Sequence, residues 1–103
     1  MLMKNFRTYG LATSFYAECR TLTLPAFLRD QLERAAASVA LNLAEGAGRQ
    51  TKADQRRFYS IAFGSLRECQ AVLDLAGVKK EGLFELSDSL AASLYKLIES
   101  RRA

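Results

Sequence analysis

The chain contains no histidine and no tryptophan, and it has only one proline and two cysteines among its 103 residues. Without histidine, the usual zinc, haem and histidine-based acid–base sites are excluded. Cys19 and Cys69 match no metal-binding spacing, so we expect buried free thiols. No apolar run approaches the ~20 residues of a membrane-spanning helix, and polar residues interrupt the segment that follows Lys4 and Arg7, where a signal peptide needs a continuous apolar stretch. These absences favour a cytoplasmic protein that holds no metal or cofactor.

What the chain does contain is ample apolar material for one folded domain. Hydrophobic residues make up 50% of the sequence, and low-complexity segments are absent. A single domain spanning residues 1–103 should bury roughly 65% of the surface that its unfolded form exposes. Fifteen Lys and Arg face eleven Asp and Glu, and the resulting net charge of +4 permits an acidic partner without requiring one.

Apolar residues recur at three- and four-residue steps along the whole chain, which predicts helices and no strand. Pro25 suits the first turn of a helix, Gly46 and Gly48 are typical stop signals, and Thr51 or its neighbour can cap the next helix. The four predicted helices span about residues 5–20, 25–45, 52–76 and 83–100. Because short connections favour antiparallel neighbours, we predict an all-α, up-down-up-down four-helix bundle.

The helical period also predicts which residues face the core of the bundle. On the third helix the predicted apolar face contains Phe58, Ile61, Ala62, Ser65, Cys69, Val72 and Ala76. On the fourth helix the predicted stripe contains Leu86, Leu90, Leu94, Leu97 and Ile98.

The second predicted helix carries a ridge of polar residues within an otherwise apolar surface. At 100° per residue, an arc of about 80° holds Gln31, Arg34, Ser38, Asn42 and Glu45. One interpretation is a structural network with a neighbouring helix, and the other is a ligand or catalytic pocket. Two carboxylates without a histidine, a metal motif or a nucleophile define no reaction, so we predict no enzymatic activity. The predicted structural polar network comprises Arg34, Ser38, Asn42, Glu45, Ser65 and Glu68.

Alanines are frequent on the same helix, where they permit close backbone approach. They stand at positions 35, 36, 37, 40 and 44, on both sides of the polar ridge. A small domain that is apolar beyond one stripe commonly buries the excess against another copy of itself. The pattern therefore predicts a homo-oligomer.

Basic and aromatic residues cluster around the start of the third predicted helix. The candidate nucleic-acid-binding residues are Arg49, Lys52, Arg56, Arg57, Tyr59, Phe63 and Arg67. Cations beside rings suit phosphate contact and base stacking, and a helix N-terminus favours phosphate. The alternative is an ordinary solvated face, with Tyr59 and Phe63 as anchors between subunits. Arg101 and Arg102 are interpreted as residues that complement a helix C-terminus.

Two segments justify naming a family. They resemble the central helices of the 23S rRNA intervening-sequence proteins. The first is QLERAAASVALNLAEGAGR, from Gln31 to Arg49, and the second is RRFYSIAFGSLRECQAVLDLA, from Arg56 to Ala76. The residues that fit the family's pattern on the second helix are Gln31, Leu32, Arg34, Ala35, Ser38, Asn42, Ala44, Glu45, Gly46 and Arg49. On the third helix they are Phe58, Ala62, Gly64, Ser65 and Glu68. The outer helices match only in length and periodicity.

The resemblance implies a small four-helix bundle that assembles as a cyclic homopentamer with a central channel. Family members were named for reading frames inside intervening sequences of bacterial rRNA genes. Similar proteins are accessory subunits of diversity-generating retroelements, in which a basic pentamer binds a reverse transcriptase and its RNA. The resemblance implies no enzymatic activity.

This chain departs from the family at two positions of the second helix. The family often has a basic residue in place of Glu33, which argues against RNA contact on the outer face of that helix. It also often has a proline in place of Ala40, so we expect a straighter helix here. Two function classes follow from the residues and the resemblance: an oligomeric module that associates with RNA or other nucleic acid, and a protein-interaction scaffold that binds no nucleic acid.

Overall fold

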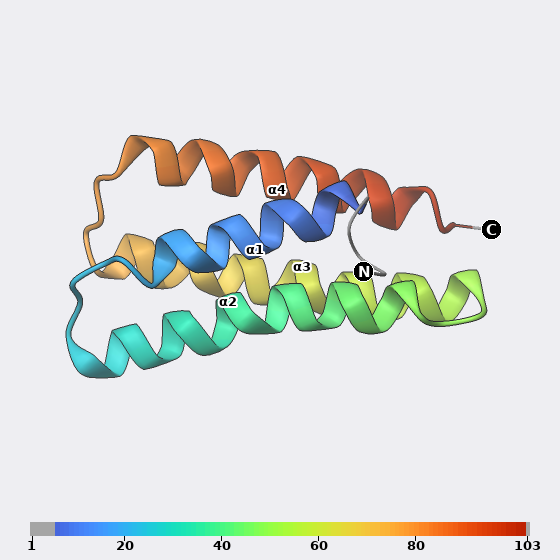
Figure 1. The fold of residues 1–103 in the computed structure, drawn as a ribbon, viewed down its shortest axis with the longest axis horizontal. Helices are drawn as coiled ribbons and strands as arrows, with labels where there is room; N and C mark the ends of the chain where they lie inside the picture. Colours follow the sequence, from blue (N-terminus) through green and yellow to red (C-terminus); the bar gives the residue numbers. More distant parts are fainter. Residues whose placement is uncertain (1–5, 103) are drawn as a thin grey trace.

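The computed structural model describes residues 6–102, which form four α-helices and no strand. The helices are α1 (Arg7–Cys19), α2 (Ala26–Ala47), α3 (Lys52–Leu75) and α4 (Glu81–Glu99). The prediction of an all-α fold with four helices is confirmed. In Figure 1 each helix runs in the direction opposite to the one before it, along a body of 41 × 22 × 21 Å.

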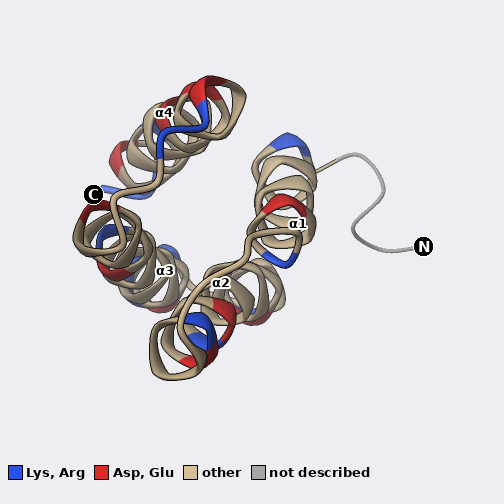
Figure 2. Cartoon of the chain, turned by 90° about the vertical axis from the view of Figure 1, so that its left-hand side faces the viewer, with Lys and Arg blue, Asp and Glu red and all other residues tan. Residues whose placement is uncertain are grey.

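The helices form a ring in which each packs against two others. Helix α2 packs against α1 and α3, and α4 packs against α1 and α3. Figure 2, which looks along the bundle from the end that holds the α1–α2 and α3–α4 connections, shows this order. The core lies inside the ring and consists of side chains such as Phe15, Leu32, Leu43, Leu66 and Leu90, each buried almost completely. A hydrogen bond between the hydroxyls of Thr8 and Ser93, 2.6 Å apart, joins α1 to α4.

Local sequence signals set the two ends of α3. The Thr51 hydroxyl accepts a hydrogen bond from the Asp54 backbone N–H at 3.1 Å, which is the predicted N-terminal cap. After the last turn, Gly77 adopts a φ of 68°, a conformation that costs glycine little. The Val78 N–H then bonds to the Leu73 carbonyl at 3.1 Å, as in a Schellman motif.

Helix α2 continues past the predicted stop at Gly46 and ends at Ala47. The reason is packing between α2 and α3. Gly46 is buried, and a Cβ atom at this position would lie 2.6 Å from Cε1 of Tyr59. Gly46 therefore permits the close approach of α2 to the Tyr59 ring, and Gly48 occupies the C-cap.

The core face of α3 matches the predicted one at Ala62, Cys69 and Val72 and differs from it elsewhere. The buried residues of α3 are Tyr59, Ala62, Leu66, Cys69, Val72 and Leu73. Phe58 and Ser65 are half-buried, and Ile61 is 43% exposed. The predicted face is the side of α3 that borders α2, whereas the true core face lies between α2 and α4, because α3 packs against both. On α4 the predicted stripe is correct at Leu90, Leu94 and Ile98, which are buried, and Leu86 and Leu97 are half-buried.

Candidate nucleic-acid interface

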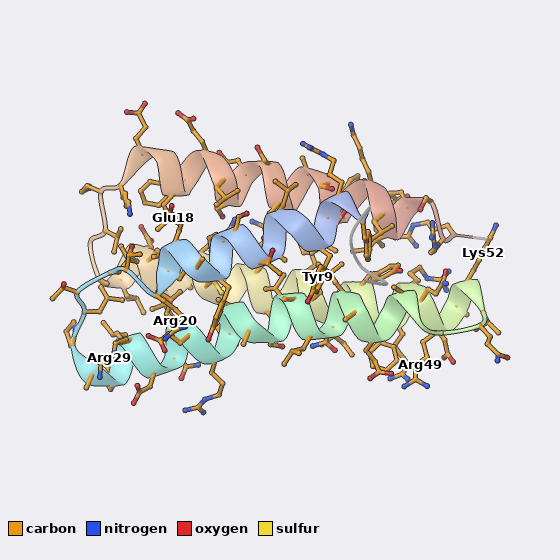
Figure 3. The ribbon with its side chains drawn as sticks, viewed as in Figure 1. Tyr9, Glu18, Arg20, Arg29, Arg49 and Lys52 are labelled. Atoms are coloured by element: carbon orange, nitrogen blue, oxygen red, sulfur yellow. The ribbon has the colours of Figure 1, made fainter. Side chains whose placement is uncertain are left out.

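Positive charge gathers at one end of the bundle. This end, on the right in Figure 1, holds the α2–α3 turn, the start of α1 and the end of α4. Its basic residues are Arg7, Arg49, Lys52, Arg56, Arg57, Lys96, Arg101 and Arg102, and its acidic residues are Glu45, Asp54 and Glu99. Figure 3 shows Arg49 and Lys52 here and Glu18, Arg20 and Arg29 at the opposite end. We call this end, defined by the eight basic residues, the basic end.

The opposite end has an excess of acidic residues. Its acidic side chains are Glu18, Asp30, Glu33, Asp74, Glu81 and Glu85, and its basic ones are Arg20, Arg29, Lys79 and Lys80. Lys80 Nζ lies 3.0 Å from a carboxylate oxygen of Glu18, so part of its positive charge is offset. The charge of residues 6–102 is therefore distributed unevenly along the bundle, and the basic end is the surface that a polyanion would approach.

Two arginines stack on one ring at the basic end. The guanidinium carbons of Arg49 and Arg57 lie 4.6 and 4.4 Å from the centroid of the Phe58 ring. Arg49 also pairs with Glu45 at 2.9 Å, and Arg57 lies 3.9 Å from Asp54. These contacts hold both guanidinium groups at the surface. Phe58 was predicted to face the core; instead, its ring is half-buried and supports the two arginines. We call Arg49, Arg57 and Phe58 the arginine–phenylalanine cluster.

The predicted basic arc is divided between two sides of α3. Arg56 is half-buried, and its guanidinium donates a hydrogen bond to the Arg101 carbonyl at 2.9 Å. Arg67 lies 5.1 Å from the centroid of Phe63 and donates to Gln70, which in turn donates to Ser87 of α4. Arg56, Phe63 and Arg67 thus belong to the side of α3 that borders α4, whereas Arg49 and Arg57 contact the ring of Phe58.

The predicted role of Tyr59 in base stacking is wrong for this structure. The Tyr59 side chain is 1% exposed and forms part of the core. Its ring packs edge-on against Phe6, with centroids 6.3 Å apart, and against Gly46. Burial raises the pKa of the phenol, and the nearby Arg101 guanidinium opposes this shift. A ring enclosed in this way cannot receive a base.

The polar ridge of α2 meets α3 at two points. The hydroxyls of Ser38 and Ser65 share a hydrogen bond of 2.8 Å, and the Asn42 amide donates to the Ser38 hydroxyl at 3.0 Å. Farther along the ridge, the Gln31 amide donates to a carboxylate oxygen of Glu68. The Ser38–Ser65 and Gln31–Glu68 hydrogen bonds join α2 to α3, whereas the Asn42 bond lies within α2.

Two members of the predicted polar network, Glu45 and Arg34, face solvent and make no hydrogen bond between α2 and α3 in the part of the chain that the structure describes. The Glu45 side chain is 53% exposed and pairs with Arg49 on its own helix terminus. Arg34 is exposed, and it lines an open pocket of about 210 Å³ together with Ser38, Ser65 and Glu68. The ridge is therefore only half-buried, and its charged residues face solvent because the α2–α3 contact is made by smaller side chains.

Asn42→Leu should lower the free energy of unfolding by ~1–3 kcal/mol, because it removes both Asn42 hydrogen bonds and leaves Ser38 with fewer partners. Glu45→Ala is the matched control, and it should change stability by less than about 1 kcal/mol because its ion pair is exposed. Urea unfolding followed by circular dichroism, at one protein concentration, measures both values. Equal losses in the two variants would contradict this division of the ridge.

Sequence reasoning missed three residues of the basic end. Tyr95 is 58% exposed on α4, and Tyr95 and Arg102 line one pocket between α3 and α4. Arg101 was interpreted as a helix-terminus residue, but its guanidinium donates to Gln55 of α3 at 2.8 Å. Their distance in sequence from the start of α3 hid them. The only signal was the pairing of two consecutive arginines with an exposed aromatic residue two helical turns earlier.

Both cysteines are buried free thiols, as predicted. Burial raises the pKa of Cys19 to about 12, and the charges of Glu18 and Glu33 add to the effect. Burial likewise raises the pKa of Cys69 well above its usual value. At neutral pH both thiols are protonated and therefore poor nucleophiles. No group of three or more metal-ligating side chains occurs among residues 6–102.

Within the same range, no helix has the length and apolar character needed to cross a membrane.

The fold and the surface define a small four-helix protein with a basic end and an apolar core. Comparison with protein families matches residues 5–100 to the 23S rRNA-intervening sequence protein family. The match covers nearly the whole chain, including both outer helices, and the chain belongs to this family. A search of curated proteins gives no match.

Proposed function

We propose that this chain is a non-enzymatic, oligomeric module that associates with RNA through its basic end. The observation that carries the proposal is the gathering of eight basic side chains at one end of a bundle whose other end has an acidic excess. The family is named for sequences within 23S rRNA genes, which is compatible with association with RNA.

The arginine–phenylalanine cluster is suited to phosphate contact. Arg49 and Arg57 are held by a ring and by carboxylates, so little side-chain freedom remains to be lost on binding. Lys52, the first residue of α3, is exposed beside them. The N-terminus of α3 adds a positive partial charge at the same place. RNA phosphates can therefore replace water around cations that already have fixed positions.

Exposed apolar side chains support self-association. Leu41 on α2 is 68% exposed, and Ile61 on α3 is 43% exposed. A second copy covering these helices would remove apolar surface from water. We propose a homo-oligomer, with the cyclic pentamer implied by the family resemblance as its specific form. A ring of subunits multiplies the charge of the basic end. Among oligomeric modules that associate with RNA, the most specific role we propose is that of an accessory subunit of a reverse transcriptase in a diversity-generating retroelement.

A protein-interaction scaffold without RNA binding is the second candidate function. The observation that favours it is the pairing of basic side chains with carboxylates, as in Arg49 with Glu45 and Arg102 with Glu99. Such pairs lower the charge available to a polyanion. Exposed Phe27 and Leu75 give this alternative an apolar contact surface at the end opposite the basic end.

A fluorescence-anisotropy titration separates the two candidates. Purified protein is titrated into labelled single-stranded RNA, structured RNA and duplex DNA, each at low and at physiological salt. We expect submicromolar RNA binding that weakens steeply with salt, because several phosphates are neutralised and their counterions released. Absence of binding at low salt would reject the RNA module in favour of the scaffold. Size-exclusion chromatography with light scattering gives the subunit number independently.

A further inference from the structure

A cavity between α3 and α4 lies at the basic end, close to the last turn of α4. Its volume is about 240 Å³, and it is open to solvent. The lining residues are Ser60, Phe63, Tyr95, Ile98, Glu99 and Arg102. Ile98, a core residue, and Phe63, which packs against the core, form the inner wall of this cavity.

Two aromatic side chains form the apolar part of this α3–α4 cavity. Tyr95 is 58% exposed on the side of α4 that faces away from the buried Leu94. Phe63 is half-buried at the outer edge of the core, and the Arg67 guanidinium lies 5.1 Å from its ring centroid. Exposed aromatic faces flanked by arginine are the surface on which unpaired bases stack in single-stranded RNA complexes.

The charges around the α3–α4 cavity separate a site for a base from sites for phosphate. Arg102 Nε lies 3.0 Å from both carboxylate oxygens of Glu99, so the arginine is fixed at the cavity rim. The Glu99 carboxylate repels a phosphate that would enter the cavity, but it can accept hydrogen bonds from the N–H groups of a base. Arg102 at the rim and Arg67, one helical turn after Phe63, each keep N–H groups that these contacts do not use and that can donate to phosphates of the same strand. The charges therefore favour a nucleobase inside the cavity and the phosphate backbone of the RNA outside it.

We infer that the α3–α4 cavity binds an unpaired nucleobase of single-stranded RNA, which stacks on Tyr95 and Phe63 while the flanking phosphates contact Arg67 and Arg102. This inference rests on the proposed function and specifies it, because it assigns the bound RNA to the single-stranded class. A base held in a paired helix is covered on both faces and cannot enter.

The first test compares RNA affinity in Tyr95→Ala and Tyr95→Phe. Loss of one stacking ring should weaken single-stranded RNA binding by roughly 5- to 150-fold. Tyr95→Phe keeps the ring and should retain wild-type affinity within about twofold. Phe84→Ala is the matched control, because Phe84 is an exposed aromatic residue in the first turn of the same helix, at the other end of the bundle. Circular dichroism and light scattering confirm that each variant keeps its fold and subunit number.

The second test uses single-stranded RNA that contains 2-aminopurine, whose fluorescence falls when the base stacks. Wild-type protein should quench it, Tyr95→Ala should quench it much less, and fully duplex RNA of the same length should bind more weakly. RNA binding that is equal for single-stranded and duplex RNA, and unchanged in Tyr95→Ala, would overturn the inference and leave the proposed function intact. Absence of binding to any RNA would instead overturn the proposed function itself.

Discussion

Tyr59→Ala should lower the free energy of unfolding by about 3–5 kcal/mol, the usual range for removing a fully buried aromatic side chain. The Tyr59 ring is 1% exposed and lies between α2, through Gly46, and the residue that precedes α1, Phe6. The missing ring would leave a cavity that the tight α2–α3 contact cannot close. For a domain of this size, such a loss is a large share of the total stability. Urea unfolding followed by circular dichroism measures it.

Tyr95→Ala is the control for this measurement, since it removes the same side chain from the surface. We expect a change below about 1 kcal/mol, because the Tyr95 ring is 58% exposed. All proteins must be compared at one protomer concentration, since self-association makes apparent stability depend on concentration. Nearly native stability in Tyr59→Ala would contradict the burial of this ring and restore it as a candidate for base stacking.

The four helices were predictable because their signals are local. The three- to four-residue period, the Thr51 cap and Gly77 all act within one or two turns. The end of α2 was not predictable from such signals. Gly46 resembles a stop signal in sequence, yet its function is to admit the Tyr59 ring from a helix that begins six residues later. Only the packing of α2 on α3 shows which of the two functions a glycine has.

The core face of α3 was misassigned for a related reason. Apolar residues surround much of this helix, so periodicity alone allows more than one face. Which of the neighbouring residues Phe58 and Tyr59 faces the core depends on where α4 lies. The position of α4 is fixed by contacts between residues distant in sequence, such as the hydrogen bond from Gln70 to Ser87. Phe58 consequently supports arginines at the surface, whereas Tyr59 fills the core.

The candidate site was half predictable. Successive helical residues point about 100° apart, so the neighbours Arg56 and Arg57 cannot share one surface. Arg57 stacks on Phe58, while Arg56 is half-buried and bonds to the Arg101 carbonyl. The basic cluster seen in the sequence is therefore divided between two surfaces, and only the weak pattern of an aromatic residue two turns before two arginines indicated that Tyr95 and Arg102 complete one of them. That completion arises because the end of α4 lies beside the start of α3.

Charge reversal of the arginine–phenylalanine cluster should strongly weaken RNA binding. In the double variant Arg49→Glu and Arg57→Glu we expect a loss of roughly 10- to 100-fold at low salt, because phosphate contacts become repulsive. The slope of log affinity against log salt should also fall by about one per lost contact. These arginines are better targets than Arg56, whose guanidinium hydrogen-bonds within the protein. Anisotropy titrations at three or more salt concentrations give both quantities.

The matched control is Arg20→Glu with Arg29→Glu at the opposite end of the bundle. It changes the net charge by the same amount, and Arg20 is also near an aromatic ring, 5.8 Å from the centroid of Tyr16. Because exposed charges farther apart than about 10 Å are largely screened at 0.1 M salt, this control should lose little affinity there. If both double variants lose affinity equally at that salt, net charge alone attracts RNA and the basic end has no special role. A loss confined to Arg49 and Arg57 would instead place the phosphate contacts where α2 turns into α3.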